Sequence, residues 1–126
     1  MKTNKYILLV DDDPLLSKLY EKKLKSAGYN IKTASDGEAA ISKVSEEKPD
    51  LIILDVMMPK MNGIEVLKKL RADEKTRNIQ VIILTNQDSS TEEMETLHKL
   101  GMHDCLIKSE TSMTTLVDRV CKLITK

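Results

Sequence analysis

The chain has 126 residues, which suits one globular domain and is too short for two. Its 20 basic and 20 acidic side chains give a formal net charge of zero, which argues against binding nucleic acid or anionic membranes through a basic surplus. With no Trp, no Phe and three Tyr, the core must be aliphatic, and stacking of nucleic-acid bases on aromatic side chains is not expected.

The sequence carries no sign of membrane insertion or export. No apolar run approaches the length of a membrane span, and residues 1–5 lack the apolar region of a signal peptide, so we expect a cytoplasmic protein. Cys105 and Cys121 lie in apolar stretches and are expected to be small buried thiols rather than a disulfide. His98 and His103 have no partner at metal-ligand spacing and are expected at the surface.

Two kinds of apolar spacing alternate along the first half of the chain. Short apolar runs indicate buried strands, whereas apolar residues at helical spacing indicate amphipathic helices. In chain order, this half predicts a strand at Tyr6–Val10, a helix whose apolar stripe is Leu15, Leu16, Leu19, Tyr20, Leu24 and Ala27, an edge strand at Tyr29–Ala34, and a helix with Ala40, Ile41 and Val44. Asp13 and Pro14 are expected to begin the first helix and Gly28 to end it.

The second half continues the alternation. It predicts a strand at Leu51–Leu54, a helix with Ile64, Leu67 and Leu70, a strand at Val81–Leu84, a helix with Met94, Leu97 and Leu100, a strand at Cys105–Ile107, and a last helix with Leu116, Val117, Val120, Cys121 and Ile124. Unbroken apolarity indicates strands that are covered on both faces, as in a parallel sheet between helices. The sequence therefore predicts an α/β fold: a (βα)5, flavodoxin-like, doubly wound five-stranded parallel sheet with helices on both faces, for which strand order 2-1-3-4-5 is common.

Polar residues follow four of the predicted strands directly. They are Asp11, Asp12 and Asp13 after the first strand, Asp55 after the third, Thr85 and Asn86 after the fourth, and Lys108 and Ser109 after the fifth. The carboxyl ends of parallel strands meet at one edge, where open α/β sheets place their ligand sites. We therefore expect these side chains to line one crevice between the first and third strands.

The residue types in this crevice indicate phosphate chemistry with a metal. Carboxylates that meet there repel one another unless a cation neutralises them. Oxygen ligands without clustered His or Cys favour Mg²⁺, which usually shares its coordination with a phosphate. Lys108 supplies a point charge for that phosphate and Thr85 a hydroxyl donor. A carboxylate in such a site can also be a nucleophile that accepts a phosphoryl group as an acyl phosphate.

The ordered set of motifs resembles a known family. It consists of Val10-Asp11-Asp12-Asp13-Pro14, Leu54-Asp55-Val56-Met57-Met58-Pro59-Lys60-Met61-Asn62-Gly63, Thr85 and Lys108. Over essentially the whole chain, the sequence resembles the receiver domain of bacterial two-component response regulators, in particular the single-domain type related to chemotaxis regulators. The resemblance implies one receiver domain over residues 1–126.

The resemblance also implies roles in phosphoryl transfer. Asp55 would accept the phosphoryl group from a phosphohistidine on a histidine kinase or a His phosphotransfer protein. Asp12 would bind Mg²⁺ directly and Asp11 mainly through water, with Asp55 and the backbone carbonyl of Met57 completing the metal site.

Two further residues would respond to the phosphoryl group. Lys108 would pair with Asp55 and then with a phosphoryl oxygen, and Thr85 would swing its hydroxyl onto the phosphoryl group. That movement would switch a protein-binding face toward a downstream protein target. The chain would then be a cytoplasmic phosphoprotein of a phosphorelay, not an enzyme beyond phosphorylation and dephosphorylation of Asp55, a monomer or weak homodimer, with no direct contact to nucleic acid or membrane.

Three positions depart from the family pattern. Ser109 replaces the usual Pro, so we expect a trans Lys108–Ser109 peptide bond and an altered loop. Cys105 stands where the family places an aromatic switch residue, which leaves open whether Thr85 is coupled to that position. Asn86 replaces a smaller residue and is expected to change the lifetime of the phosphoryl group.

Other functions and roles stay open from the residues alone. A degenerate receiver would bind proteins without phosphorylation. A phosphohydrolase that forms an aspartyl phosphate would need a second acid two residues after Asp55, where the chain has Met57. A flavodoxin-type cofactor module is disfavoured because Asp11, Asp12 and Asp13 would repel the cofactor's phosphate. Nearby, Met57, Met58 and Met61 are interpreted as core packing, with a docking surface as the alternative.

Overall fold

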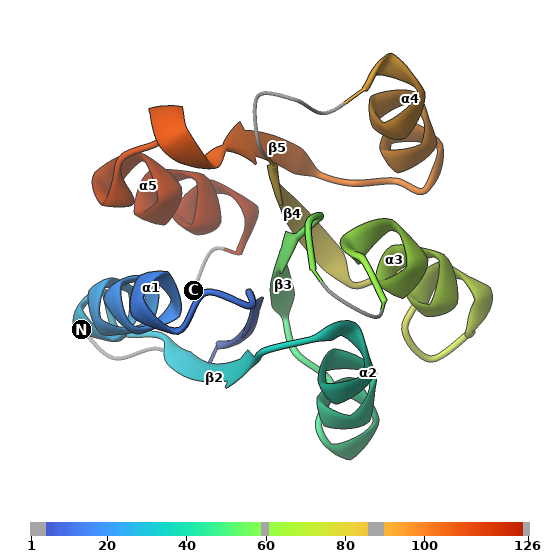
Figure 1. The fold of residues 1–126 in the computed structure, drawn as a ribbon. Coiled ribbons are helices and arrows are strands. Elements are labelled where there is room, and N and C mark those ends of the chain that lie inside the picture. The colour runs from blue at the N-terminus through green and yellow to red at the C-terminus, as the bar shows by residue number, and fades with distance from the viewer. Residues whose placement is uncertain (1–4, 59–60, 86–89, 125–126) are drawn as a thin grey trace.

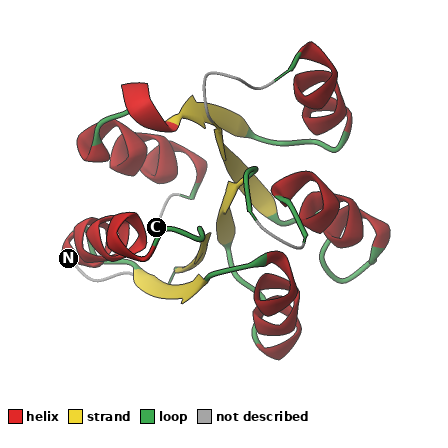
Figure 2. Cartoon of the chain, viewed as in Figure 1, coloured by secondary structure: helices red, strands yellow, loops and turns green. Residues whose placement is uncertain are grey.

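The computed structural model describes residues 5–58, 61–85 and 90–124, which alternate between strand and helix (Figures 1 and 2). The strands are β1 (Tyr6–Val10), β2 (Asn30–Ala34), β3 (Leu51–Asp55), β4 (Gln80–Thr85) and β5 (Asp104–Ile107). The helices are α1 (Pro14–Ser26), α2 (Gly37–Glu46), α3 (Gly63–Ala72), α4 (Thr91–Lys99) and α5 (Met113–Leu123), with a 3₁₀ turn, η1 (Lys108–Glu110), between β5 and α5.

The strands form one parallel sheet in the order β2-β1-β3-β4-β5. The predicted fold class and strand order are therefore confirmed. Helices α1 and α5 cover one face of the sheet, and α2, α3 and α4 cover the other (Figure 1). Because every strand runs in the same direction, the residues that follow β1, β3, β4 and β5 emerge at the same edge of the sheet.

The core consists of two aliphatic layers, one on each face of the sheet. In β1, Leu8 and Val10 pack toward α2 and α3, whereas Ile7 and Leu9 pack toward α1 and α5. All four side chains are fully buried, and strands β3 and β4 alternate in the same way. This explains the unbroken apolar runs, because each residue of a central strand faces one of two covered sides. Burial of a Leu or Ile side chain contributes about 1.5–3 kcal/mol relative to its exposure.

Side-chain caps determine where the helices begin. The carboxylate of Asp13 accepts hydrogen bonds from the backbone N–H groups of Leu15 and Leu16 at 3.0 and 3.2 Å, and Pro14 occupies the first turn as predicted. Asn62 and Glu65 form a reciprocal capping box at the start of α3. None of the described helices combines the length and the apolar character required to cross a bilayer.

The predicted apolar stripe of α1 is wider than the face that the helix buries. Tyr20 and Leu24 are buried, but Leu15 is 71% exposed and Leu19 is 49% exposed, which corrects their expected place in the core. The buried face of α1 turns toward the sheet and α5, and positions 15 and 19 lie one turn apart outside it. Spacing alone does not show how much of a stripe its neighbours cover.

The two cysteines are free, as predicted, but only partly in the expected surroundings. Cys105 is half-buried in β5, whereas Cys121 on α5 is exposed, which corrects the expectation of two buried thiols. The Sγ atom of Cys121 lies 3.1 Å from the hydroxyl oxygen of Tyr29, which directly precedes β2.

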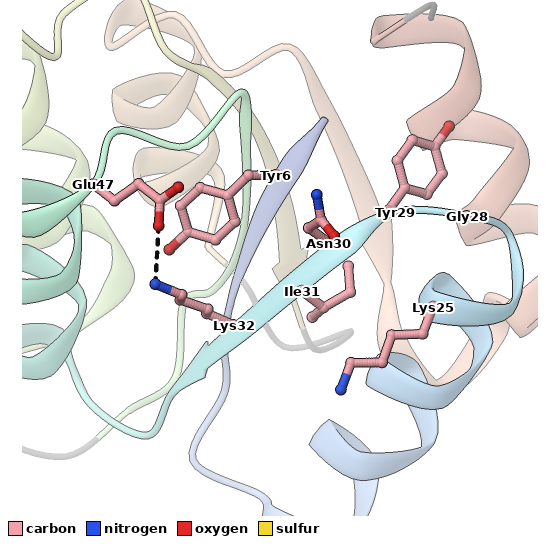
Figure 3. A pocket seen from close by; sticks show the side chains of 8 residues that line it. All are labelled: Tyr6, Lys25, Gly28, Tyr29, Asn30, Ile31, Lys32 and Glu47. Carbon is pink, nitrogen blue, oxygen red and sulfur yellow. Dashed lines mark hydrogen bonds and ion pairs between the residues drawn. The ribbon is translucent and has the colours of Figure 1, made fainter. Parts of the chain in front are cut away.

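β2 is one of the two edge strands of the sheet (Figure 3). Lys32 on β2 pairs with Glu47 at 2.9 Å, and its ammonium group lies 5.5 Å from the ring centroid of Tyr6. A shallow cavity of about 530 Å³ follows this edge. A charged Lys on an edge strand disfavours pairing with the edge of another sheet.

Gly63 generates a prediction about how α3 packs against β3. A Cβ atom at this position would overlap the carbonyl oxygen of Asp55 and lie 2.9 Å from the Cα atom of Val56. Gly63→Ala should therefore lower the free energy of unfolding by about 1–3 kcal/mol, because backbone would have to move. Urea denaturation measures this change. The exposed α3 substitution Lys68→Ala should stay within about 0.5 kcal/mol of wild type, and equal stability of both variants would contradict the close approach.

Candidate functional site

Four strand ends bring the predicted site residues to one edge of the sheet. Asp11 directly follows β1, Asp55 ends β3, Thr85 ends β4, and Lys108 directly follows β5. Asp11, Asp55 and Thr85 are each at most 3% exposed. The parallel sheet thus places two buried carboxyl groups, one hydroxyl and one ammonium group at the same edge, as the sequence predicted.

Lys108 connects the two buried carboxylates. Its Nζ atom donates to Oδ2 of Asp55 at 3.0 Å and to Oδ1 of Asp11 at 3.2 Å. The Lys108 side chain is 16% exposed, and the Asp11 and Asp55 side chains are 0% and 2% exposed. A residue from after the fifth strand therefore holds together the ends of the first and third strands.

Tight turns orient the carboxylates from the other side. Oδ1 of Asp55 accepts the backbone N–H of Met57 at 3.1 Å, and Oδ1 of Asp11 accepts the backbone N–H of Asp13 at 3.0 Å. These bonds span two residues each, so they form wherever the chain turns directly after the strand. Oδ2 of Asp55 consequently faces Lys108 and the interior of the site.

The acidic residues form a group that could hold a metal ion. Carboxylate oxygens of Asp11, Asp12 and Asp55 all lie within 4.8 Å of one another. Oδ2 of Asp11 is buried and lies 3.2 Å from Nζ of Lys108, without a hydrogen bond of its own to the residues that the structure describes. One ammonium group cannot offset three carboxylates, so this donor set fits a divalent cation with a preference for oxygen.

Burial dominates the electrostatics of the site. It raises the pKa of Asp55 to about 6, and the charge of Asp11 adds to this rise, while Lys108 and the N–H of Met57 oppose it. Burial acts against the charge on Lys108, but its contacts with Asp55 and Asp11 prevail and raise its pKa. Lys108 therefore stays cationic, whereas Asp55 holds its proton to a higher pH than an exposed aspartate.

The remaining predicted residues lie around this centre. Met57 is beside Asp55 in the loop after β3, and its side chain is 57% exposed, whereas Met58 and Met61 pack against the core. The interpretation of the methionines as core packing is therefore right for two of them and wrong for Met57. Asn86 lies outside the described residues.

The departures at Ser109 and Cys105 have local structural consequences. The described residues contain no cis peptide bond, so the expected trans bond between Lys108 and Ser109 is present. The chain enters η1 at this point. Cys105 packs against the core on the α4 side of β5. Its thiol is smaller than the aromatic ring that the family pattern places at this position.

Two residues of α1 support the site without having been predicted to do so. The Ser17 hydroxyl lies 3.4 Å from the carbonyl oxygen of Asp11 and is 8% exposed. Tyr20 is 3% exposed, and its pKa is raised by burial and affected by the charges of Lys108, Asp11 and Asp55. The sequence signal for this role was the polar Ser17 among the apolar residues of α1.

Comparisons with known proteins identify the family of this site. Residues 7–120 match the family model described as "Response regulator receiver domain". The chain belongs to the response regulator receiver family. The receiver is 44% identical over 105 residues to PhoP, the alkaline phosphatase synthesis transcriptional regulatory protein of Bacillus subtilis. That match covers 83% of the receiver and 42% of PhoP, so the chain spans less than half the length of this relative.

Solved structures of receivers share the fold over nearly the whole chain. Chemotaxis response regulator CheY4 of Vibrio cholerae has a TM-score of 0.87 at 29% identity and covers 97% of this chain and 100% of its own. The receiver domain of the Francisella response regulator 1452 has a TM-score of 0.84 at 35% identity, with coverage of 95% and 96%. The motif-based assignment to the receiver family is therefore confirmed.

The raised pKa of Asp55 predicts a pH-dependent effect of Asp55→Asn on stability without metal. An unfolded aspartate loses its proton near pH 3.8, but the native carboxyl keeps it to about pH 6, so ionisation costs the native state stability as the pH rises. Asn stays neutral. In EDTA, the free energy of unfolding of Asp55→Asn relative to wild type should rise by on the order of 2 kcal/mol between pH 4 and 7. Above pH 7 this difference should stay constant.

Thermal or urea unfolding across this pH range measures the difference. The control is Asp118→Asn on α5, which is exposed and should show little change with pH. A constant difference between Asp55→Asn and wild type from pH 4 to 8 would contradict a raised pKa at Asp55.

Proposed function

We propose that this receiver accepts a phosphoryl group on Asp55 from the phosphohistidine of a histidine kinase or a His phosphotransfer protein. The observation that carries the proposal is the placement of the Asp55 carboxylate. One oxygen is held by the N–H of Met57, and the other faces Lys108 beside the carboxylates of Asp11 and Asp12. The receiver would be one domain over residues 1–126, acting in the cytoplasm as a signalling domain rather than as an enzyme.

Asp55 is arranged to act as a nucleophile. A carboxylate oxygen of Asp55 attacks phosphorus, the P–N bond to the donor histidine breaks, and the imidazole nitrogen leaves with its electron pair and then takes a proton. Lys108 already contacts the carboxylate at 3.0 Å and can neutralise charge on a phosphoryl oxygen in the product. The reaction requires the ionised form of Asp55, which is favoured above its pKa of about 6.

The acidic group would hold Mg²⁺. Asp12 is exposed and would bind the ion directly, Asp11 would bind mainly through water, and Asp55 and the carbonyl of Met57 would complete the set. Mg²⁺ would supply positive charge to the phosphoryl oxygens and lower the repulsion between phosphate and carboxylates. The buried Oδ2 of Asp11 supports this assignment, because the Lys108 ammonium that lies 3.2 Å from it is shared with Asp55, and a buried carboxylate whose charge is only partly offset is costly.

Thr85 would transmit the change to a protein-binding face. It ends β4, is 3% exposed, and precedes the segment that leads to α4. A phosphoryl group on Asp55 adds charge and acceptor oxygens within the same strand-end cluster, and a hydroxyl donor that moves toward them shifts the equilibrium of the following loop. Because Cys105 is small, the shift of Thr85 would act mainly through this loop and α4.

An apolar surface beside the site would receive the phosphodonor protein. Leu15, Leu19 and Met57 are the large hydrophobic side chains that stand exposed in the described part of the chain. Leu15 and Leu19 lie one helical turn apart on α1, which begins three residues after Asp11, and Met57 is two residues from Asp55. A partner that covers them would bring its phosphohistidine to Asp55 and exclude water from the transfer.

Phosphorylation of Asp55 is tested by incubation with acetyl phosphate and Mg²⁺, followed by intact mass measurement. We expect one added phosphoryl group on wild type, none without Mg²⁺, and none on Asp55→Asn, because the amide is not a nucleophile. Asp118→Asn keeps every site residue and should be labelled like wild type.

A second variant separates the metal from the acceptor. Asp12→Ala should retain its fold, since Asp12 is exposed, but should lose labelling because Mg²⁺ binds weakly. Normal labelling of Asp12→Ala would overturn the metal assignment. Labelling of Asp55→Asn would overturn the acceptor, and an unlabelled wild type would favour a degenerate receiver that binds proteins without phosphorylation.

The exposed surface on α1 predicts a difference between protein and small-molecule donors. Leu15→Ser with Leu19→Ser should reduce phosphotransfer from an autophosphorylated histidine kinase by about tenfold, because apolar contact area is lost from the encounter complex. Labelling by acetyl phosphate should be unchanged. The measurement is transfer of ³²P from a panel of histidine kinases of the source organism.

The control for this experiment is Lys68→Ser with Lys69→Ser on α3, which changes two exposed residues of a helix on the other face of the sheet from α1. Equal transfer rates for the leucine variant and wild type would contradict the docking surface. A matching loss with acetyl phosphate would show damage to the site instead.

A further inference from the structure

A second polar cavity lies at the amino ends of the strands, whereas Asp55 lies at their carboxyl ends. It has a volume of about 360 Å³, and its lining residues are Arg71, Arg77, Asn78, Lys99, Leu100, Gly101 and His103. These residues come from the end of α3, the segment before β4, the end of α4 and the segment before β5. The amino ends of β4 and β5 are thus beside this cavity, whereas their carboxyl ends are beside Asp55.

Arg71 forms the half-buried base of the cavity. Its guanidinium donates to the carbonyl oxygens of Leu100, Arg77, Ile79 and Gly101 at 2.6, 2.9, 2.9 and 3.1 Å. Four of its five N–H donors are therefore used, and one on Nη2 remains. Two of these carbonyl oxygens, from Leu100 and Gly101, directly follow α4, and the Arg71 cation offsets part of the repulsion that a helix C-terminus exerts on an anion.

The other polar side chains of the cavity present donors. Arg77 and Lys99 are exposed, and neither has an acidic partner within 4 Å among the residues described. Nδ1 of His103 accepts the backbone N–H of Val81 at 3.2 Å, so the neutral ring carries its proton on Nε2 as a further donor. Partial burial and the charge of Arg71 lower the pKa of His103, which favours this neutral form.

Asp73 and Asp104, which are close to the cavity residues in the sequence, have other partners. The lining of the cavity contains no carboxylate in the part of the chain that is described. Asp73 accepts the backbone N–H of Lys75 at 2.9 Å, and Asp104 pairs with Arg119 at 2.7 Å. In a chain with equal numbers of acidic and basic residues, this is a local surplus of three cations in one concave place.

We propose that this cavity binds a small anion with two or more phosphate groups. Three cations and additional N–H donors, without a carboxylate among the described lining residues, match a ligand that only accepts hydrogen bonds and carries several negative charges. The volume of about 360 Å³ exceeds what one phosphate fills. The site is independent of the proposed phosphorylation of Asp55, since the two lie at opposite ends of the strands.

Titration of the ¹⁵N-labelled protein with inorganic pyrophosphate in EDTA, at about 0.15 M ionic strength, tests the proposal. We expect saturable shifts of the amide signals of Asn78, Gly101 and His103. Arg77→Gln with Lys99→Gln should weaken binding by at least about tenfold, because two of the three cations are lost. Both side chains are exposed, and the Arg77 carbonyl that accepts from Arg71 is retained.

Charge-matched and ligand controls complete the experiment. Lys22→Gln with Lys122→Gln removes two exposed cations from α1 and α5 and should bind pyrophosphate within about twofold of wild type. Sulfate should bind at least about tenfold more weakly than pyrophosphate. The proposal is overturned by shifts that do not saturate, by equal affinity of the two double variants, by equal affinity for sulfate, or by shifts centred on Met57 and Lys108. Labelling of Asp55 by acetyl phosphate should be the same in both double variants.

Discussion

The ammonium group of Lys108 lies between two buried carboxylates, and the site is built around this contact. Asp11 and Asp55 would repel each other at the ends of neighbouring strands if no cation stood between them. Lys108 reaches both within 3.2 Å from the far side of β4. One cation against two carboxylates leaves an excess of negative charge, and this imbalance is what a divalent metal or a change in protonation can relieve.

This imbalance links stability to chemistry. Burial makes Asp55 a stronger base than an exposed aspartate, and the same burial costs the native state stability when the carboxyl ionises. The protein tolerates this cost because the aliphatic layers on both faces of the sheet supply most of the favourable free energy. Under the proposed function, this partly compensated carboxylate would be the one that a metal ion and a phosphoryl group stabilise.

The carboxyl ends and the amino ends of the strands lie beside side chains of opposite charge. Strand carboxyl ends present Asp11 and Asp55, which attract cations, whereas the amino ends of β4 and β5 lie beside Arg71 and its cationic neighbours. Arg71 also ties the end of α4 to the segment before β4 through four carbonyl oxygens. Helix α4 is thus anchored at one end, while its other end follows the segment after Thr85.

The sequence by itself determined the type and the order of the strands and helices, the start of α1 at Asp13 and Pro14, and the candidate residues Asp55 and Lys108, and the sheet has the order that is common for this pattern. These features depend on the spacing of apolar residues, on helix-capping residues and on the order of the motifs, all of which can be read from residues close together in the sequence. Only the tertiary structure decided that Leu15 is exposed, that Cys121 faces outward, and that Arg71 collects four carbonyl groups. Exposure and such contacts depend on which surfaces of distant segments meet, and no spacing along one segment contains that information.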